Sequence, residues 1–87
     1  MTDSPILNEF NRVKELHPDI IALFRVGDYY ESYCQDAEIV SDVAEIPLYK
    51  LHIEMAGFHH SKLDNVLQKL VRAGHRVGIF SLLPLSS

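Results

Sequence analysis

Hydrophobic positions in the first part of the chain recur at the spacing of an amphipathic helix. Ser4 followed by Pro5 is a helix-start signal, because a serine side chain caps free N–H groups and proline suits the first helical position. Pro18 ends the pattern, so a first helix is predicted between Ser4 and Pro18. The apolar residues on its predicted buried face are Ile6, Phe10, Val13 and Leu16.

The next hydrophobic run is short and nearly continuous, and it covers residues 20–26 (IIALFRV). It is too short for a second helix and is typical of a central strand that is covered on both faces. Gly27 and Asp28 predict a turn or bend, and the aromatic-rich segment 29–34 favours extended structure. A pair of strands is therefore expected after the first helix.

The rest of the chain contains two more helical patterns and two more strand patterns. Residues 36–45 return to helical spacing, whereas residues 51–55 alternate between apolar and polar side chains, as in a strand with one solvated face. A third helix is predicted from a cap at Ser61 to a stop at Gly74, and residues 76–82 predict a buried strand. This order indicates an α/β domain with a small mixed β-sheet flanked by about three helices.

Length and composition limit the classes of protein to which the chain can belong. Its 87 residues make one small domain, residues 1–87, with room for a single core. No apolar run is long enough for a membrane span, and the start MTDSPILNEF lacks the features of a signal peptide. The single cysteine, Cys34, cannot form an internal disulfide, which agrees with a reducing compartment, and a cytoplasmic protein is expected.

Charge is unevenly distributed along the chain, whose net charge is −4. Net acidity on its own argues against nucleic-acid binding, because the neutralisation of phosphates needs clustered Lys and Arg side chains. Residues 28–45 contain six acids and no Lys or Arg, whereas residues 46–87 contain five bases and two acids. Either one end of the domain is basic and another acidic, or both runs are solvated helix faces.

Four segments of the chain carry a more specific signal. They are residues 17–39 (HPDIIALFRVGDYYESYCQDAEI), 46–50 (IPLYK), 55–58 (MAGF) and 70–79 (LVRAGHRVGI). In order and spacing, these segments resemble successive blocks of domain I of the MutS family of DNA mismatch repair proteins. The resemblance covers nearly the whole chain and implies a small mixed sheet flanked by helices, in agreement with the element order predicted above.

In that family the segment Gly-x-Phe-Tyr-Glu carries the mismatch contact: the phenylalanine wedges beside the mispaired base, and the glutamate bonds to it. The matching positions are Gly27, Asp28, Tyr29, Tyr30 and Glu31. Residues two apart on a strand project to the same side, about 7 Å apart, so a ring and a carboxylate can meet one base step together. The resemblance therefore implies a DNA contact by Tyr29 and Glu31. The alternatives are that Tyr29 packs within the domain and that Glu31 is a solvated acid at a strand end.

Several positions depart from the family pattern. Tyr29 replaces the wedge phenylalanine, and a phenol hydroxyl left without a partner in a base stack would cost about 1 to 3 kcal/mol. The family's Leu-Thr-Lys-Arg is Leu-Tyr-Lys-Leu at residues 48–51, so a basic residue is lost. In Met-Ala-Gly-x-Pro-x-His-Ala, His59 and Ser61 stand in place of the proline and the histidine, and the final Cys-Glu-Gln is Phe-Ser-Leu at residues 80–82. These changes indicate a diverged or repurposed copy.

Other chemistry has little support in the sequence. His52, His59 and His60 suggest a metal site, but adjacent histidines on a strand point apart and no cysteine or carboxylate recurs at zinc spacing. Neither a metal nor any other cofactor is expected. The sequence contains no GxxxxGK[ST] phosphate loop, and a hydrolase that uses Asp28, Glu31 and His60 rests on residue types alone.

The favoured interpretation is a non-catalytic DNA-binding module that resembles the mismatch-recognition domain of MutS, with Tyr29 and Glu31 at its contact tip. The candidate phosphate partners are Lys50, Lys62 and Arg76, with Lys69 and Arg72 as further candidates. The expected partner is mismatched duplex DNA, bound weakly by this domain alone, with other MutS-like domains or protein partners beside it and no membrane. The alternative is a repurposed protein-interaction module with the same fold and no DNA binding.

Overall fold

A computed structural model describes residues 4–81 and confirms the predicted α/β class, a mixed five-stranded sheet with three α-helices. The elements in chain order are α1 (Pro5–Leu16), β1 (Ile20–Val26), β2 (Tyr29–Tyr33), α2 (Cys34–Ala44), β3 (Leu48–Lys50), β4 (Glu54–His59), the 3₁₀ turn η1 (His60–Lys62), α3 (Leu63–Arg72) and β5 (Arg76–Ser81). The observed order contains one strand more than predicted, because the segment between α2 and α3 forms two strands.

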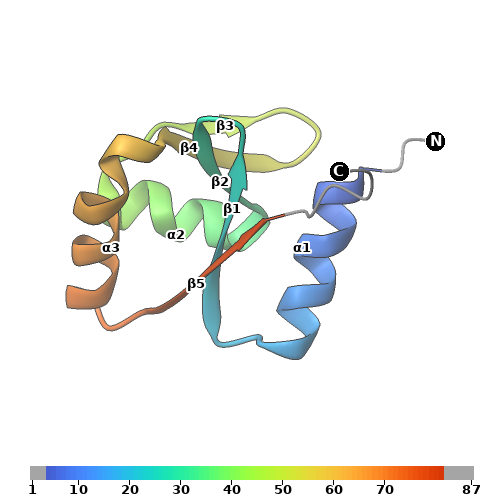
Figure 1. Ribbon diagram of the computed structural model, residues 1–87, viewed down its shortest axis with the longest axis horizontal. Coiled ribbons are helices and arrows are strands. Elements are labelled where there is room, and N and C mark those ends of the chain that lie inside the picture. The colour runs from blue at the N-terminus through green and yellow to red at the C-terminus, as the bar shows by residue number, and fades with distance from the viewer. Residues whose placement is uncertain (1–3, 82–87) are drawn as a thin grey trace.

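The sheet has the strand order β3-β4-β2-β1-β5. β1 and β5 run parallel, whereas β1 and β2, β2 and β4, and β3 and β4 are antiparallel pairs. Helix α1 covers one face of the sheet, and α2 and α3 cover the other (Figure 1). The β1–β2 hairpin and the end of β4 therefore meet at one end of the sheet, beyond the cover of these helices.

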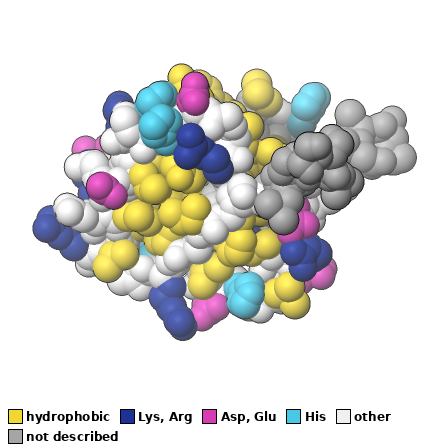
Figure 2. Space-filling model, viewed as in Figure 1, with side chains coloured by type: hydrophobic (Ala, Val, Ile, Leu, Met, Phe, Trp, Pro, Cys, Tyr) yellow, Lys and Arg dark blue, Asp and Glu magenta, His cyan; other side chains and the backbone are white. Residues whose placement is uncertain are grey.

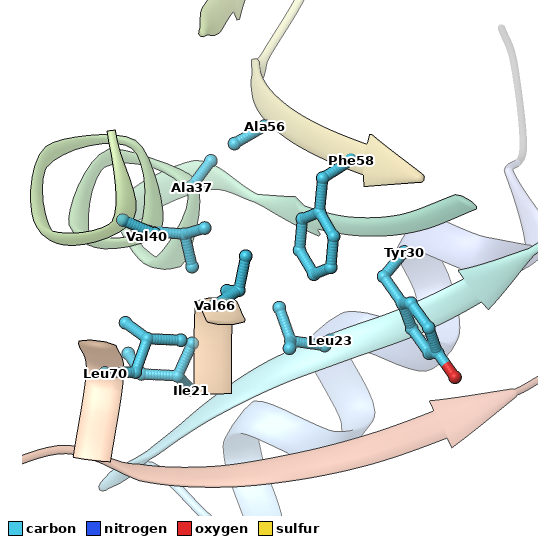
Figure 3. Close-up of a cluster of buried hydrophobic side chains, with 10 residues drawn as sticks. Ile21, Leu23, Tyr30, Ala37, Val40, Ala56, Phe58, Val66 and Leu70 are labelled. Atoms are coloured by element: carbon cyan, nitrogen blue, oxygen red, sulfur yellow. The ribbon is translucent and has the colours of Figure 1, made fainter. Parts of the chain in front are cut away.

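β1 is an interior strand covered on both faces, as its apolar run predicted. Ile21 and Leu23 point toward α2 and α3, and Ala22 and Phe24 point toward α1. The cluster on the first side consists of Ile21, Leu23, Tyr30, Ala37, Val40, Ala44, Ala56, Phe58, Val66 and Leu70 (Figure 3). The cluster on the α1 side consists of Phe10, Val13, Ala22, Phe24 and Tyr33. The sheet thus has two cores, and burial of these side chains stabilises the position of β1 between them.

Helix α1 begins as the sequence predicted. The Ser4 side chain accepts a hydrogen bond of 3.2 Å from the N–H of Leu7, and Pro5 is the first helical residue. Phe10 and Val13 are buried, but Leu16 is 61% exposed, so the apolar face ends one turn earlier than expected.

The strand predicted at residues 51–55 is wrong in its position. Residues 51–53 form a bend between β3 and β4, in which the N–H of Leu51 donates to the carbonyl of Ile53 at 3.2 Å. Leu51 fits the alternating pattern of apolar and polar residues, but its side chain is 80% exposed and does not contribute to the core. The segment of alternating apolar and polar residues spans the bend at which the chain reverses between β3 and β4. The pattern alone does not predict this bend.

Two predictions for the C-terminal part also need correction. Ser61 does not cap α3: it lies within η1, its N–H donates to Nδ1 of His59, and α3 follows Lys62 without a side-chain cap. Strand β5 is not buried, because it is the outer strand of the sheet and Ile79 is 45% exposed. The predicted end of that strand at Leu82 lies outside the described residues. Gly74 does end the helical segment, with φ of +93°.

Candidate nucleic-acid interface

A tight hairpin joins β1 to β2 at the free end of the sheet, near the top of Figure 1. Val26 and Tyr29 are paired across it, and Gly27 and Asp28 form the turn. Gly27 has φ of +60° at the first central position, which type II′ hairpin turns assign to glycine. The side chain of Arg25 also donates to the carbonyl of Gly27 at 2.5 Å. Residues 27–31 are called the hairpin tip below.

Tyr29 and Tyr30 take opposite sides of the sheet. Tyr30 is 8% exposed, and its ring stacks on Phe58 with 5.8 Å between ring centroids. Tyr29 is 50% exposed and lies on the other side, together with Glu31. The strand therefore holds the Tyr30 ring in the core and presents the Tyr29 ring and the Glu31 carboxylate on one side.

Glu31 is half-buried and held in orientation by a neighbour on the same strand. The hydroxyl of Tyr33 donates a hydrogen bond to Oε1 of Glu31. Burial, followed by this bond, raises the pKa of Tyr33 well above its ordinary value, so the hydroxyl stays protonated and remains a donor. Gly57 lies opposite Glu31 on β4, and a Cβ placed there would be 3.4 Å from Cγ of Glu31. The glycine thus leaves the surface beside the carboxylate open.

The end of β4 packs against the hairpin tip. His59 pairs with Tyr29, and the two rings meet edge to face, with centroids 5.5 Å apart and planes at 86°. The backbone N–H of His60 donates to the carbonyl of Asp28 at 2.9 Å, which ties the hairpin turn to the start of η1. The two segments therefore form one structural unit from residues far apart in the sequence.

The predicted basic residues separate into two groups. Lys62 is exposed at the end of η1, two residues after His60, whose backbone N–H bonds to the hairpin turn. Lys50 pairs with Glu54 at the opposite end of β4, about 17 Å from His59 at the usual rise of a strand. Arg76 pairs with the first residue of β1 and contacts Asp19 at 3.6 Å, about 20 Å from the hairpin. Tyr29 and Glu31 therefore share one side of β2 and Lys62 follows the segment that is bonded to the hairpin turn, whereas Lys50 and Arg76 lie at the far end of the sheet.

Arg25 is a basic residue of the hairpin that sequence reasoning did not select. It is exposed, and its guanidinium carbon lies 5.3 Å from the centroid of the Tyr30 ring. Together with the contact to Gly27, this packing holds a cation beneath the turn. Its position two residues before Gly27 could have indicated a role at the hairpin turn. Because Arg25 lies within the apolar run of β1, it was interpreted as an ordinary strand residue.

The candidate metal ligands named from the sequence do not form one cluster in the described residues. Among residues 4–81, His, Cys, Asp and Glu side chains form no group of three that could hold a metal ion. His52 lies in the bend between β3 and β4, whereas His59 and His60 lie at the other end of β4. No helix in the same residues is long and apolar enough to cross a membrane.

Fold and site together define a small α/β domain that presents an aromatic-x-Glu pair at the free end of a mixed sheet. The family model of MutS domain I matches residues 4–82, and the chain belongs to this family. The DNA mismatch repair protein MutS of Porphyromonas gingivalis is 42% identical over 85 residues, and that of Parabacteroides distasonis is 46% identical over 85 residues. Each alignment covers 91% of this chain and 10% of the relative, so the chain spans about a tenth of the length of these proteins.

Proposed function

We propose that this chain is a non-catalytic DNA-binding module that contacts mispaired duplex DNA through Tyr29 and Glu31. The observation that carries the proposal is the exposure of the Tyr29 ring, whereas the ring of Tyr30, the next residue of the same strand, is buried. A solvent-exposed ring on a rigid strand is available to a partner without any rearrangement of the core. Membership of the MutS domain I family supports the same role.

The proposed mechanism uses the low cost of unstacking a mispaired base. Insertion of an aromatic ring costs a few kcal/mol per base step, and less where the pairing is already broken, so the ring detects weak pairing. Tyr29 stacks beside the base, and Glu31 accepts a hydrogen bond from its exposed edge. The bond from Tyr33 orients the Glu31 carboxylate for this contact.

Electrostatics limit how strongly the domain alone binds DNA. Arg25, which bonds to the hairpin turn, and Lys62, at the end of η1, are proposed as phosphate partners there, whereas Lys50 and Arg76 would reach only phosphates farther along the duplex. With a net charge of −4, we expect a dissociation constant of roughly 10⁻⁴ M or weaker at physiological salt. Tight binding would need further MutS-like domains or protein partners.

We also propose that the protein is cytoplasmic and that any ATPase activity resides outside this domain.

A second candidate function is a protein-interaction module, and an exposed apolar surface favours it. Val71 on α3 and Ile79 on β5 are 60% and 45% exposed, respectively. Figure 2 shows hydrophobic side chains gathered between α3 and β5 on the face turned to the viewer. Contiguous apolar surface of this kind often contacts another protein. This surface lies on the opposite side of the sheet from Tyr29, so the two functions are compatible.

Fluorescence anisotropy with labelled duplexes tests the proposed function. The 87-residue chain is titrated into a fully paired duplex and into duplexes of the same sequence that carry one mismatch or one unpaired base. The measurement uses low salt and high protein concentration, because the expected affinity is weak. We expect tighter binding to the mismatched duplexes. Equal binding to all duplexes would reject mismatch recognition, and nanomolar binding by a monomer would contradict the proposed electrostatic limit.

A further inference from the structure

Besides its packing against the neighbouring ring of His60, with ring centroids 4.4 Å apart, His59 makes two separable contacts at the hairpin tip. The edge-to-face packing against the ring of Tyr29 is the first. The second is made by Nδ1, which accepts a hydrogen bond of 3.2 Å from the backbone N–H of Ser61 and also lies 2.9 Å from Oγ of Ser61. Because a backbone N–H can only donate, Nδ1 is the acceptor and the neutral ring carries its hydrogen on Nε2. One nitrogen of the imidazole thus caps η1 while the ring contacts Tyr29.

The contact with His59 restricts the exposed ring of Tyr29. Tyr29 is the first residue of β2, and half of its surface is exposed, so its ring is not fixed within the core. His59 is its partner across the strand pair, and edge-to-face aromatic pairs stabilise a definite relative orientation. The backbone of β4 fixes His59, because η1 begins at the next residue and is bonded to the hairpin turn.

We propose that His59 is a positioning residue for mismatch recognition, which holds the Tyr29 ring ready for insertion beside the mispaired base. This role rests on the proposed function of Tyr29. A ring held in one orientation before binding loses less conformational freedom on insertion, so the mismatched complex gains affinity. The matched duplex does not receive the ring, and its affinity is independent of the contact. His59 therefore sets the preference for mismatched over matched DNA and not the overall affinity.

Two substitutions separate positioning from capping. His59→Asn keeps an oxygen acceptor suited to a helix N-cap but removes the ring, whereas His59→Phe keeps the ring but removes the acceptor. We expect His59→Asn to keep a thermal midpoint near that of the wild type and to lose about threefold to tenfold of the mismatch preference. We expect His59→Phe to lower the midpoint and to keep the preference. His52→Asn removes an exposed imidazole at the opposite end of β4 and is the matched control, with an unchanged preference.

The outcomes distinguish the role of His59 from the proposed function itself. A wild-type chain that binds matched and mismatched duplexes equally rejects mismatch recognition, and the positioning role with it. A wild-type preference that His59→Asn retains in full overturns the positioning role alone. Equal losses in His59→Asn and His52→Asn also overturn it, because they would report the loss of an imidazole irrespective of any contact with Tyr29. If His59→Phe does not fold, the comparison of His59→Asn with His52→Asn still decides between these outcomes.

Discussion

The carboxylate of Asp36, on α2, accepts a hydrogen bond of 3.0 Å from the backbone N–H of Ala22, on β1. The carbonyl of Ala22 accepts another of 3.0 Å from the hydroxyl of Ser32. Strand β2 pairs with β1 only at residues 24–26, so these two side chains satisfy backbone groups that have no strand partner. Lys14 of α1 completes the arrangement with an ion pair of 3.0 Å to Asp36, which connects helices on the two faces of the sheet.

The first prediction is that Asp36→Ala destabilises the fold strongly. The substitution leaves the N–H of Ala22 without an acceptor and the ammonium of Lys14, whose side chain is 23% exposed, without its counter-charge. Breaking a buried pair of this kind costs about 3 kcal/mol or more. Urea denaturation measures the loss. Asp42→Ala, which removes an exposed acid from the same helix, is the control and should change the free energy of unfolding by less than about 0.5 kcal/mol.

The second prediction concerns a pair of acids, Glu54 on β4 and Glu38 on α2. A hydrogen bond with Glu38 is the main cause that raises the pKa of Glu54 above its ordinary value of 4.5, with smaller effects from burial and from the charge of Glu38, opposed by the charge of Lys50. A raised pKa means that the folded state binds this proton more tightly. The stability that this proton contributes is therefore present below pH 4.5 and is lost as the pH rises through the pKa of Glu54 in the folded state.

Glu54→Gln should accordingly raise the thermal midpoint increasingly as the pH rises above 4.5, because the wild type loses this stabilising proton and the amide does not. The advantage should vanish below pH 4.5, where Glu54 is protonated in both states. Differential scanning calorimetry across this range checks the sign. Asp42→Asn, an exposed change on α2, should show no such pH-dependent gain. A Glu54→Gln variant whose midpoint follows the wild type at every pH would show that the two acids do not interact.

Parts of the fold that depend on local patterns were predictable from the sequence. The seven-residue run of β1 and the Ser4-Pro5 start of α1 follow directly from strand length and capping chemistry. Leu51 and Ile79 are apolar residues whose exposure depends on where the sheet reverses or ends. The position of the reversal and the edge of the sheet are features of tertiary structure, and alternation of apolar and polar residues does not specify them.

For the site, the spacing of Tyr29 and Glu31 was sufficient to predict that they share one side of β2. The separation of Lys62 from Arg76 was not predictable, because both bases flank the same helix in sequence. α3 begins beside the hairpin tip and ends at the opposite end of the sheet, so only strand register reveals their distance. The contact between His59 and Tyr29 likewise depends on the register of β2 with β4.

The third prediction uses this separation of charges. Lys62→Ala and Arg25→Ala should each reduce the slope of log affinity against log salt by about 0.9, because each would remove one phosphate contact beside the hairpin tip. Arg76→Ala should change the slope less, since Arg76 lies at the far end of the sheet and contacts Asp19. Anisotropy titrations with the matched duplex at several salt concentrations give the slopes. Equal effects of Lys62→Ala and Arg76→Ala would indicate a footprint that extends along the whole domain.

The last prediction concerns Tyr29 and decides between the two candidate functions. Tyr29→Ala should abolish the preference for mismatched duplex and lower stability by no more than about 1 kcal/mol, because the ring is 50% exposed. Truncation of an aromatic side chain in a core would instead cost about 3 kcal/mol or more. Tyr29→Phe should keep or improve the preference, because a base stack offers no partner to the hydroxyl that it removes.

Denaturation midpoints and paired titrations of Tyr29→Ala and Tyr29→Phe, with matched and mismatched duplexes, provide the test. Tyr30→Phe is a useful comparison, since its ring lies in the core and on the other side of the sheet. The lost hydroxyl accepts a hydrogen bond of 3.4 Å from Arg25, a proposed phosphate partner, so the overall affinity can change. The mismatch preference should stay unchanged, because a phosphate contact does not distinguish mismatched from matched DNA. A stable Tyr29→Ala chain that binds both duplexes as the wild type does would exclude the wedge. The exposed surface between α3 and β5 would then be the better candidate for function, and the protein-interaction module the better description of the domain.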